Sequence, residues 1–538
     1  MNTEQDIETF NKYLNILLDN HTFDNEQIAD IKLKFGKISQ VYADHDFEAI
    51  KSNGYRSTIH CLASMVKICI EEHSSKPHFE SVFKFVHFIL DQLINCIEMS
   101  KISEDKTYCP LINDHHRKYF DDLQKIGPEL HQIIPNYCGR FFMPSTQLIY
   151  KNLIPIATYL KTFSMMDNVI SLINSDYRHK TLAHKATTRS MDETIQFFLM
   201  VNNYFAKLYH GAYSYIFHSD ISRRDHQVDF VSTFELKLVE TPNVDIVIDR
   251  NETGFRTSSL PVRVRIYGTK TFDHQTRSKV VLHAQGGAYV SGSPETTEPY
   301  LLDMVRMIPE AVVVSVDYGK APICKFPTPL QQLLDVYSWL TSGDTSVIET
   351  IGFQPDDIVF FGDSSGATLL ISLLCVIADI QHQWSDSNLK LPSAILSVYG
   401  SLTLSWSLLP SHLTTTADPI LNHLSFIRAS EAVSPFSPIF EDQDDRYVKH
   451  EQFQLSPYLS PIHYKHWERL MSVNLVLYTS SLCPGLDINI SMAKKWLGPV
   501  SLEVADREPH GFMTFYRQSK TATAATLDVS DQLRSLVK

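Results

Sequence analysis

The chain has 538 residues, of which 43% are hydrophobic and 20% charged, and this composition excludes disordered, collagenous and coiled-coil proteins. Lysine and arginine number 48 against 61 aspartates and glutamates, which gives a formal net charge of −13. Such a charge repels phosphate backbones, so nucleic acid is not an expected partner. The length predicts about three to four domains of average size, or two large ones.

The eight cysteines and the N-terminal sequence both favour an intracellular protein. No C-x-x-C pair and no cysteine–histidine cluster at zinc spacing occurs, so we expect reduced thiols and no bound metal. The first twenty residues have neither a basic region nor a small-residue cleavage site, which argues against a secretory signal. The longest apolar stretch, Ala367 to Ile380, is too short to span a bilayer. We expect a cytosolic protein whose contact with membranes or lipid surfaces is peripheral.

Glycine is scarce in the first half of the chain, where only five of the 19 glycines occur before residue 251. From residue 1 to 225, apolar residues recur at three- and four-residue spacing, as in Val86, Ile89 and Leu93. This spacing predicts a helical domain over residues 1–225. A helical core without chemistry of its own is the simpler interpretation, and a ligand-binding role is the alternative.

The second half, residues 226–538, alternates short β-branched runs with helical segments, which predicts an α/β domain with a mostly parallel sheet covered on both faces. The expected strands are Val262–Tyr267, Val280–His283, Ala311–Val316, Ile358–Phe361, Ala394–Val398, Val473–Tyr478 and Val500–Val504. The expected helices are Glu298–Ile308, Pro329–Leu340, Ala367–Ile380 and Ile488–Trp496. The stretch from about 405 to 465 is rich in proline and serine and is interpreted as a cap or insertion.

The segment Gly362-Asp363-Ser364-Ser365-Gly366 lies between an expected buried strand and a long apolar helix. A serine on a tight strand-to-helix turn needs small neighbours, because strand and helix approach closely there, and the turn exposes its hydroxyl above the sheet. This setting favours Ser364 as a nucleophile over a plain glycine-rich connection.

Two further segments complete a hydrolytic pattern. In His283-Ala284-Gln285-Gly286-Gly287, the adjacent glycines can turn the N–H groups of Gly286 and Gly287 toward a developing oxyanion, and the Ser365 N–H can complete that hole. Taken alone, the two glycines would more often form a simple turn. His510 follows the last expected strand near the C-terminus, and the chain order serine then histidine makes it the best candidate for a general base.

These segments resemble motifs of the hormone-sensitive lipase family of α/β hydrolases. The matching pairs are QGGA with H-G-G-G, Asp317 to Pro327 with D-Y-x-x-A-P-x-x-x-F-P, and GDSSGA with G-D-S-A-G-G. Two earlier segments, Asn53 to Ser57 and Tyr137 to Phe141, resemble the helical N-terminal domain of the animal members. The resemblance implies hydrolysis of acylglycerols and cholesteryl esters in the cytosol, with recruitment to lipid droplets and without a cofactor.

The chain departs from the family pattern at the catalytic acid. The segment YTSSLCPGLDIN is similar to L-D-P-x-x-D, and it carries Cys483 where the resemblance places the aspartate. Loss of that acid costs serine proteases roughly four decades of kcat. Asp487, at the second acidic position, is one candidate substitute. A Cys483 thiolate is another, although a neutral thiol is the simpler interpretation.

Two more departures concern the oxyanion segment and regulation. Gln285 and Ala288 replace the first and last positions of H-G-G-G, while the two central glycines remain. The region from about 430 to 460 has no room for the long phosphorylated module of the mammalian members.

We therefore predict a carboxylic ester hydrolase that acts on lipid esters through Ser364 and His510. The alternative is a catalytically impaired relative that binds lipid or a protein partner. A short-chain esterase without a lipid role is a third interpretation.

Overall fold

The structure is a computed structural model. It describes residues 2–19, 25–72, 76–101, 141, 143, 145, 218–240, 244–251, 261–270, 278–405, 409–416, 418, 420–421, 423–436 and 444–538. The expectations for residues 102–140 and 146–217, including most of the second N-terminal motif, lie outside the described residues.

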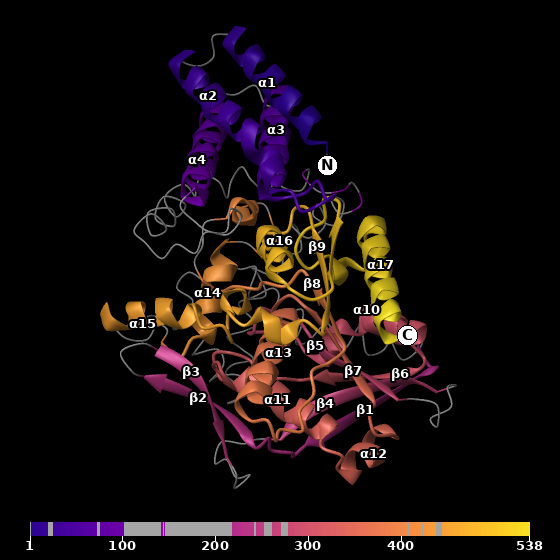
Figure 1. The fold of residues 1–538 in the computed structure, drawn as a ribbon. Coiled ribbons are helices and arrows are strands. Elements are labelled where there is room, and N and C mark those ends of the chain that lie inside the picture. The colour runs from indigo at the N-terminus through magenta and orange to yellow at the C-terminus, as the bar shows by residue number, and fades with distance from the viewer. Residues whose placement is uncertain are drawn as a thin grey trace, which may run out of the picture.

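The described part of the N-terminal region is helical, as its periodicity predicts. It contains α1 (Thr3–Asp19), α2 (Asn25–Val41), α3 (Gly54–Glu72) and α4 (Lys76–Ser100). These helices form a body of their own at one end of the molecule (Figure 1). Their apolar faces close on a separate core that also includes Leu413 and Leu482 from the second half. The helical body is therefore packed directly on the second part of the chain.

The second part is built on an eight-stranded sheet with the order β1-β4-β6-β5-β7-β8-β9-β10. The strands β5 to β10 run parallel, and β4 and β1 add an antiparallel edge. The bounds are β1 (Ile221–Val228), β4 (Val262–Thr269), β5 (Lys279–Ala284), β6 (Ala311–Val316), β7 (Asp357–Asp363), β8 (Ala394–Val398), β9 (Asn474–Ser480) and β10 (Val500–Ala505). The expected mostly parallel α/β sheet is confirmed.

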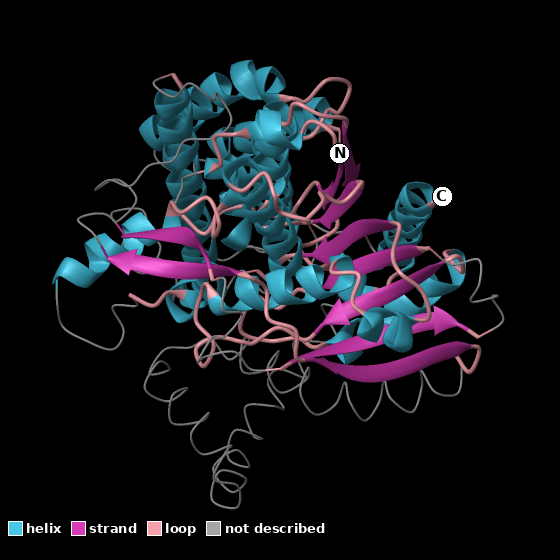
Figure 2. Cartoon of the chain, turned by 60° about the horizontal axis from the view of Figure 1, so that its bottom comes forward, coloured by secondary structure: helices cyan, strands magenta, loops and turns pink. Residues whose placement is uncertain are grey.

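Helices cover both faces of this sheet (Figure 2). Alternate residues of β5 face opposite cores, because successive side chains of a strand point to opposite sides. One face packs against α11 (Thr328–Thr341), α13 (Ser365–Gln383) and α16 (Leu486–Lys495). The other packs against α10 (Pro294–Met307) and α17 (Lys520–Val537).

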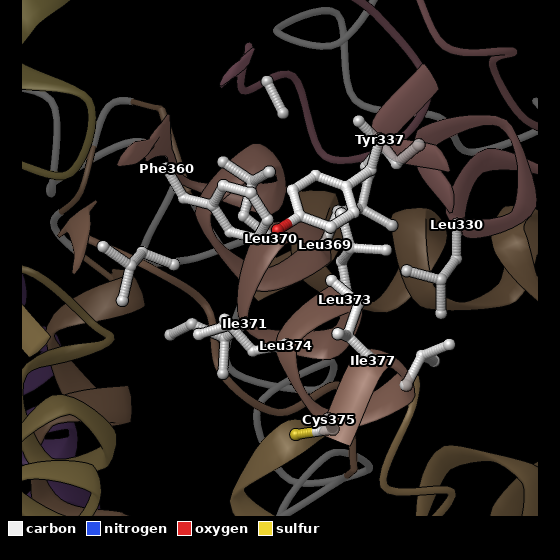
Figure 3. Close-up of a cluster of buried hydrophobic side chains, with 14 of the residues drawn as sticks. Leu330, Tyr337, Phe360, Leu369, Leu370, Ile371, Leu373, Leu374, Cys375 and Ile377 are labelled. Atoms are coloured by element: carbon white, nitrogen blue, oxygen red, sulfur yellow. The ribbon is translucent and has the colours of Figure 1, made fainter. Parts of the chain in front are cut away.

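Helix α13 lies at the centre of the first core, where its leucines meet Phe360 of β7 and Tyr337 of α11 (Figure 3). Its 19 residues are long and apolar enough to cross a bilayer by length and composition, which corrects the expectation that this stretch is too short. However, 83% of its most apolar window is buried inside the protein. The helix therefore serves here as a core element behind the Ser364 turn.

Several elements differ from the sequence expectations. Strand β1 begins at Ile221, so the sheet starts before the expected boundary between residues 225 and 226. A two-stranded sheet of β2 (Phe234–Glu240) and β3 (Val244–Arg250), and the helix α12 (Thr345–Ile351), were not expected. The segment between β8 and β9 contains the 3-10 helix η4 (Pro410–Thr416), α14 (His423–Val433) and α15 (Asp444–Gln454), within the expected insertion at 405–465.

Candidate active site

Ser364 occupies a strained turn between the end of β7 and the start of α13. Its φ of 50° and ψ of −124° are rarely adopted by a non-glycine residue. The positions of Gly362 and Gly366 leave no room for a side chain. A Cβ at Gly362 would lie 2.8 Å from the Ala367 nitrogen, and one at Gly366 would collide with the Ala284 carbonyl. The strand and helix thus approach as closely as the pattern predicts.

His510 lies on the loop after β10 and reaches Ser364. Its Nε2 is 2.8 Å from the Ser364 Oγ, within hydrogen-bond distance. The Tyr399 ring packs edge-on against the imidazole with the centroids 5.0 Å apart. Burial lowers the pKa of His510 to about 3. The imidazole is therefore neutral at neutral pH, and it can accept the hydroxyl proton.

The other ring nitrogen of His510 faces sulfur instead of a carboxylate. Cys483 Sγ lies 3.3 Å from His510 Nδ1 and accepts a long hydrogen bond from the Gly485 N–H at 3.4 Å. Burial raises the pKa of the Cys483 thiol to about 12, with a further contribution from the charge of Asp418. The group that faces His510 Nδ1 is thus a neutral thiol.

Asp487 does not replace the acid, which corrects that candidate. Its buried carboxylate accepts hydrogen bonds from the backbone N–H groups of Gly54 and Ser411, each at 2.8 Å. No contact of this carboxylate with His510 is present. The Ser57 hydroxyl also donates to the Ser481 carbonyl, so the N-terminus of α3 is docked on the loop that carries Cys483. The role of Asp487 is to join the helical body to this loop.

The expected oxyanion segment also needs one correction. The Gly286 N–H donates to Asp363 Oδ1 at 2.9 Å, so it is engaged and not free for an oxyanion. The N–H groups of Gly287 and Ala288 have no acceptor among the described residues, and the Ser365 N–H lies at the start of α13, where first-turn donors have no intrahelical partner. These three groups are the available donors, and Ala288 is held at a φ of 53°.

The loop that carries these donors is anchored by hydrogen bonds that the sequence did not predict. The Tyr318 hydroxyl donates to the Gln285 carbonyl at 2.7 Å, and the Tyr289 N–H donates to Ser365 Oγ at 3.3 Å. The Gln285 amide, oriented so that both ends find partners, donates to the Val316 carbonyl and accepts from Lys320 Nζ. Gln285 therefore ties the loop to the end of β6, although it departs from the family motif.

Asp418, in the insertion between β8 and β9, is a further carboxylate at the site. Its Oδ2 accepts the backbone N–H of His510 at 2.8 Å, and its Oδ1 accepts those of Ile420 and Leu421. Burial raises the pKa of Asp418 to about 7. Nothing in the local sequence points to this contact, because 92 residues separate the two partners.

Buried carboxylates, imidazoles and thiols do not gather here into a cation site. Among the described residues, no three His, Cys, Asp or Glu side chains form a cluster that could hold a metal ion.

Comparisons with known proteins match the second part of the chain. Residues 281–514 match a family model described as alpha/beta hydrolase fold. Mouse hormone-sensitive lipase is 29% identical over 158 residues, which are 29% of this chain and 19% of that protein. Rat arylacetamide deacetylase is 28% identical over 208 residues, 38% of this chain and 48% of that protein. A Pyrobaculum calidifontis esterase structure aligns with a TM-score of 0.47 and 19% identity, covering 66% of this chain and 97% of its own.

The second part of the chain therefore has the α/β-hydrolase fold and is similar in sequence to lipases and esterases. The aligned region spans about a fifth of mouse hormone-sensitive lipase and about half of the rat deacetylase.

Proposed function

We propose that this protein is a serine carboxylic ester hydrolase. The observation that carries the proposal is the 2.8 Å approach of Ser364 Oγ to His510 Nε2, with Ser364 held in a strained strand-to-helix turn. A hydroxyl at such a turn, next to a neutral imidazole and with unpaired backbone N–H groups on the neighbouring loop, is an arrangement that suits acyl transfer.

In the proposed reaction, the Ser364 hydroxyl attacks the ester carbonyl while His510 Nε2 takes its proton. The N–H groups of Gly287, Ala288 and Ser365 then stabilise the negative oxygen of the tetrahedral intermediate. His510 returns the proton to the leaving alcohol, and a water molecule hydrolyses the acyl-enzyme by the same steps. Each proton thus passes between Ser364, His510 and the departing or attacking oxygen.

For the substrate, we propose neutral lipid esters, namely acylglycerols and cholesteryl esters, met in the cytosol by peripheral contact with a lipid droplet or membrane. The support is the similarity to hormone-sensitive lipases in the second part of the chain and the helical body in front of it. Because the chain is also similar to an arylacetamide deacetylase, smaller esters are a second class of candidate substrate. The substrate test must therefore contain both kinds of ester.

The test is hydrolysis of p-nitrophenyl butyrate and of emulsified diacylglycerol by the full chain and by Ser364→Ala. We expect turnover by the wild type and its loss in Ser364→Ala, because the nucleophile is gone. Diacylglycerol cleavage supports the lipase assignment, whereas cleavage of the short ester alone indicates an esterase without a lipid role.

The sulfur at position 483 favours one rival, a relative that binds lipid or a protein partner without hydrolysis. That rival predicts no turnover by the wild type and none by Cys483→Asp, which restores a carboxylate beside His510. This result would replace the enzyme proposal.

A further inference from the structure

The site contains a carboxyl group next to His510 that does not face its Nδ1. Asp418 is 4% exposed, and its Oδ2 accepts the His510 backbone N–H. Its charge also acts on Cys483, the group in contact with His510 Nδ1. Asp418 therefore contacts the backbone of His510, and its charge reaches the thiol that faces the His510 ring.

Cys483 cannot supply the charge that the reaction needs. When His510 accepts the Ser364 proton it becomes an imidazolium, and a buried positive charge is unfavourable without a negative partner. A thiol with a pKa raised to about 12 stays neutral at neutral pH. Asp418 is the carboxylate placed to act on this imidazolium across a buried, weakly screened region, where charge interactions are strong.

We propose that Asp418 is a positioning residue that takes over the electrostatic role of the missing triad acid, stabilising the His510 imidazolium from the backbone side. This inference rests on the proposed ester hydrolysis. The proton moves from Ser364 Oγ to His510 Nε2 and then to the leaving alcohol, and none is transferred to Asp418. Cys483 remains a neutral partner of Nδ1 throughout.

The experiment compares Asp418→Asn in two backgrounds, the native chain and Cys483→Asp. Asparagine has one side-chain oxygen, so it can accept backbone N–H groups where one of the two Asp418 oxygens now does but not where both do. Both backgrounds therefore lose the same hydrogen bonding. They differ in whether another carboxylate faces His510. In the native chain, Asp418→Asn should slow the reaction about tenfold, which equals one pKa unit of imidazolium stabilisation. In the Cys483→Asp background, the same substitution should slow the reaction less than about threefold.

Two rates are measured, p-nitrophenyl butyrate hydrolysis and phosphonylation of Ser364 by a fluorophosphonate, which also counts correctly folded sites. Phosphonylation requires the same serine and base without ester turnover. Absence of hydrolysis would therefore contradict the proposed function, while the phosphonylation rates still decide the role of Asp418.

The pH profile separates a charge effect from a structural one. Because burial raises the pKa of Asp418 to about 7, the native rate should fall as the pH drops through 7, and Asp418→Asn should lose that step. Of the other groups facing the pair, Cys483 and Tyr399 have raised pKa values and stay neutral. Asp363, with a pKa raised to about 6, gives a step common to both proteins.

Equal losses from Asp418→Asn in both backgrounds, or an unchanged pH profile, would show that Asp418 only holds the loop and would overturn the inference. Asp487→Asn is the matched control, since it alters another buried carboxylate that accepts backbone N–H groups. Its effect should be the same in both backgrounds.

Discussion

At the scale of single residues, we expect the side chain at position 483 to govern the rate of the proposed hydrolysis, because it faces His510 Nδ1. We expect Cys483→Asp to raise kcat on p-nitrophenyl butyrate by about 100-fold, part of the roughly four decades that a triad acid contributes in serine proteases. The carboxylate would face His510 Nδ1 where the sulfur now lies at 3.3 Å, and the Gly485 N–H is already directed at this position. The measurement is kcat and KM for both proteins.

Cys483→Ala is the control for this substitution, because it removes the sulfur without adding a charge. Its kcat should stay within a few-fold of the wild type, since a neutral thiol contributes little to imidazolium stability. A gain in Cys483→Ala equal to that in Cys483→Asp would show that the thiol obstructs the site and that charge is irrelevant.

The sequence pointed to site residues through local geometry for Ser364 and through chain order for His510. Ser364 and its glycines were recognised because a strand, a tight turn and a helix follow each other within a few residues. Asp418 and the use of the Gly286 N–H by Asp363 were missed. Both depend on contacts between segments more than 70 residues apart, and only the folded chain brings these together.

At the scale of elements, the buried carboxylate of Asp487 is one of the contacts that dock α3 on the Cys483 loop. We expect Asp487→Ala to lower the free energy of unfolding by about 2–5 kcal/mol, because it leaves the Gly54 and Ser411 N–H groups buried without an acceptor. Urea unfolding followed by circular dichroism measures the loss. Gly54→Ala should also destabilise the protein, since its methyl group would collide with Ser411 and Asp487.

Asp386→Ala is the control for this contact. Asp386 pairs with Arg250 on the surface, where ion pairs contribute little because water screens them. If Asp487→Ala proves as mild as Asp386→Ala, the α3 contact is not a stabilising junction.

Elements with a strong apolar signal were predicted well, and polar ones were not. The seven expected strands all occur within two residues of their predicted bounds, because buried strands are nearly continuous apolar runs. Strand β1, with the sequence ISRRDHQV, was missed. It lies at the antiparallel edge of the sheet, where its polar side chains meet solvent and other charges, so no apolar run marks it.

At the scale of the whole molecule, the response to acid depends on buried imidazoles. Burial lowers the pKa of four of them, to about 3 for His283 and His510 and about 4 for His450 and His463. In the unfolded chain these groups take up protons below about pH 6.5, so the unfolded state binds more protons between pH 6.5 and 4. Stability must therefore fall as the pH falls through this window.

Three buried carboxyls of the described residues oppose this trend. Burial raises the pKa of Asp363 to about 6 and of Asp418 to about 7, and it also raises the pKa of Asp487. Over much of the same window the folded state binds their protons more tightly than the unfolded state, so their protonation stabilises the fold as the pH falls. Among the described residues, these four imidazoles outweigh the three carboxyls, so we expect net destabilisation by acid.

One imidazole can be removed to test this balance. His283 is fully buried in β5, with Nδ1 2.8 Å from Ser315 Oγ, and His283→Gln keeps a polar group without a proton to gain. As the pH falls from 6 to 4, the free energy of unfolding of His283→Gln should rise relative to that of the wild type by about 1.4 kcal/mol for each pH unit. Urea unfolding followed by tryptophan fluorescence reports on the second part of the chain, because all five tryptophans lie there.

His466→Gln, which replaces a half-exposed imidazole, is the control. The free energy of unfolding of this variant should depend on pH as it does in the wild type. If His283→Gln also shows the wild-type dependence on pH, burial of the His283 imidazole does not govern acid stability.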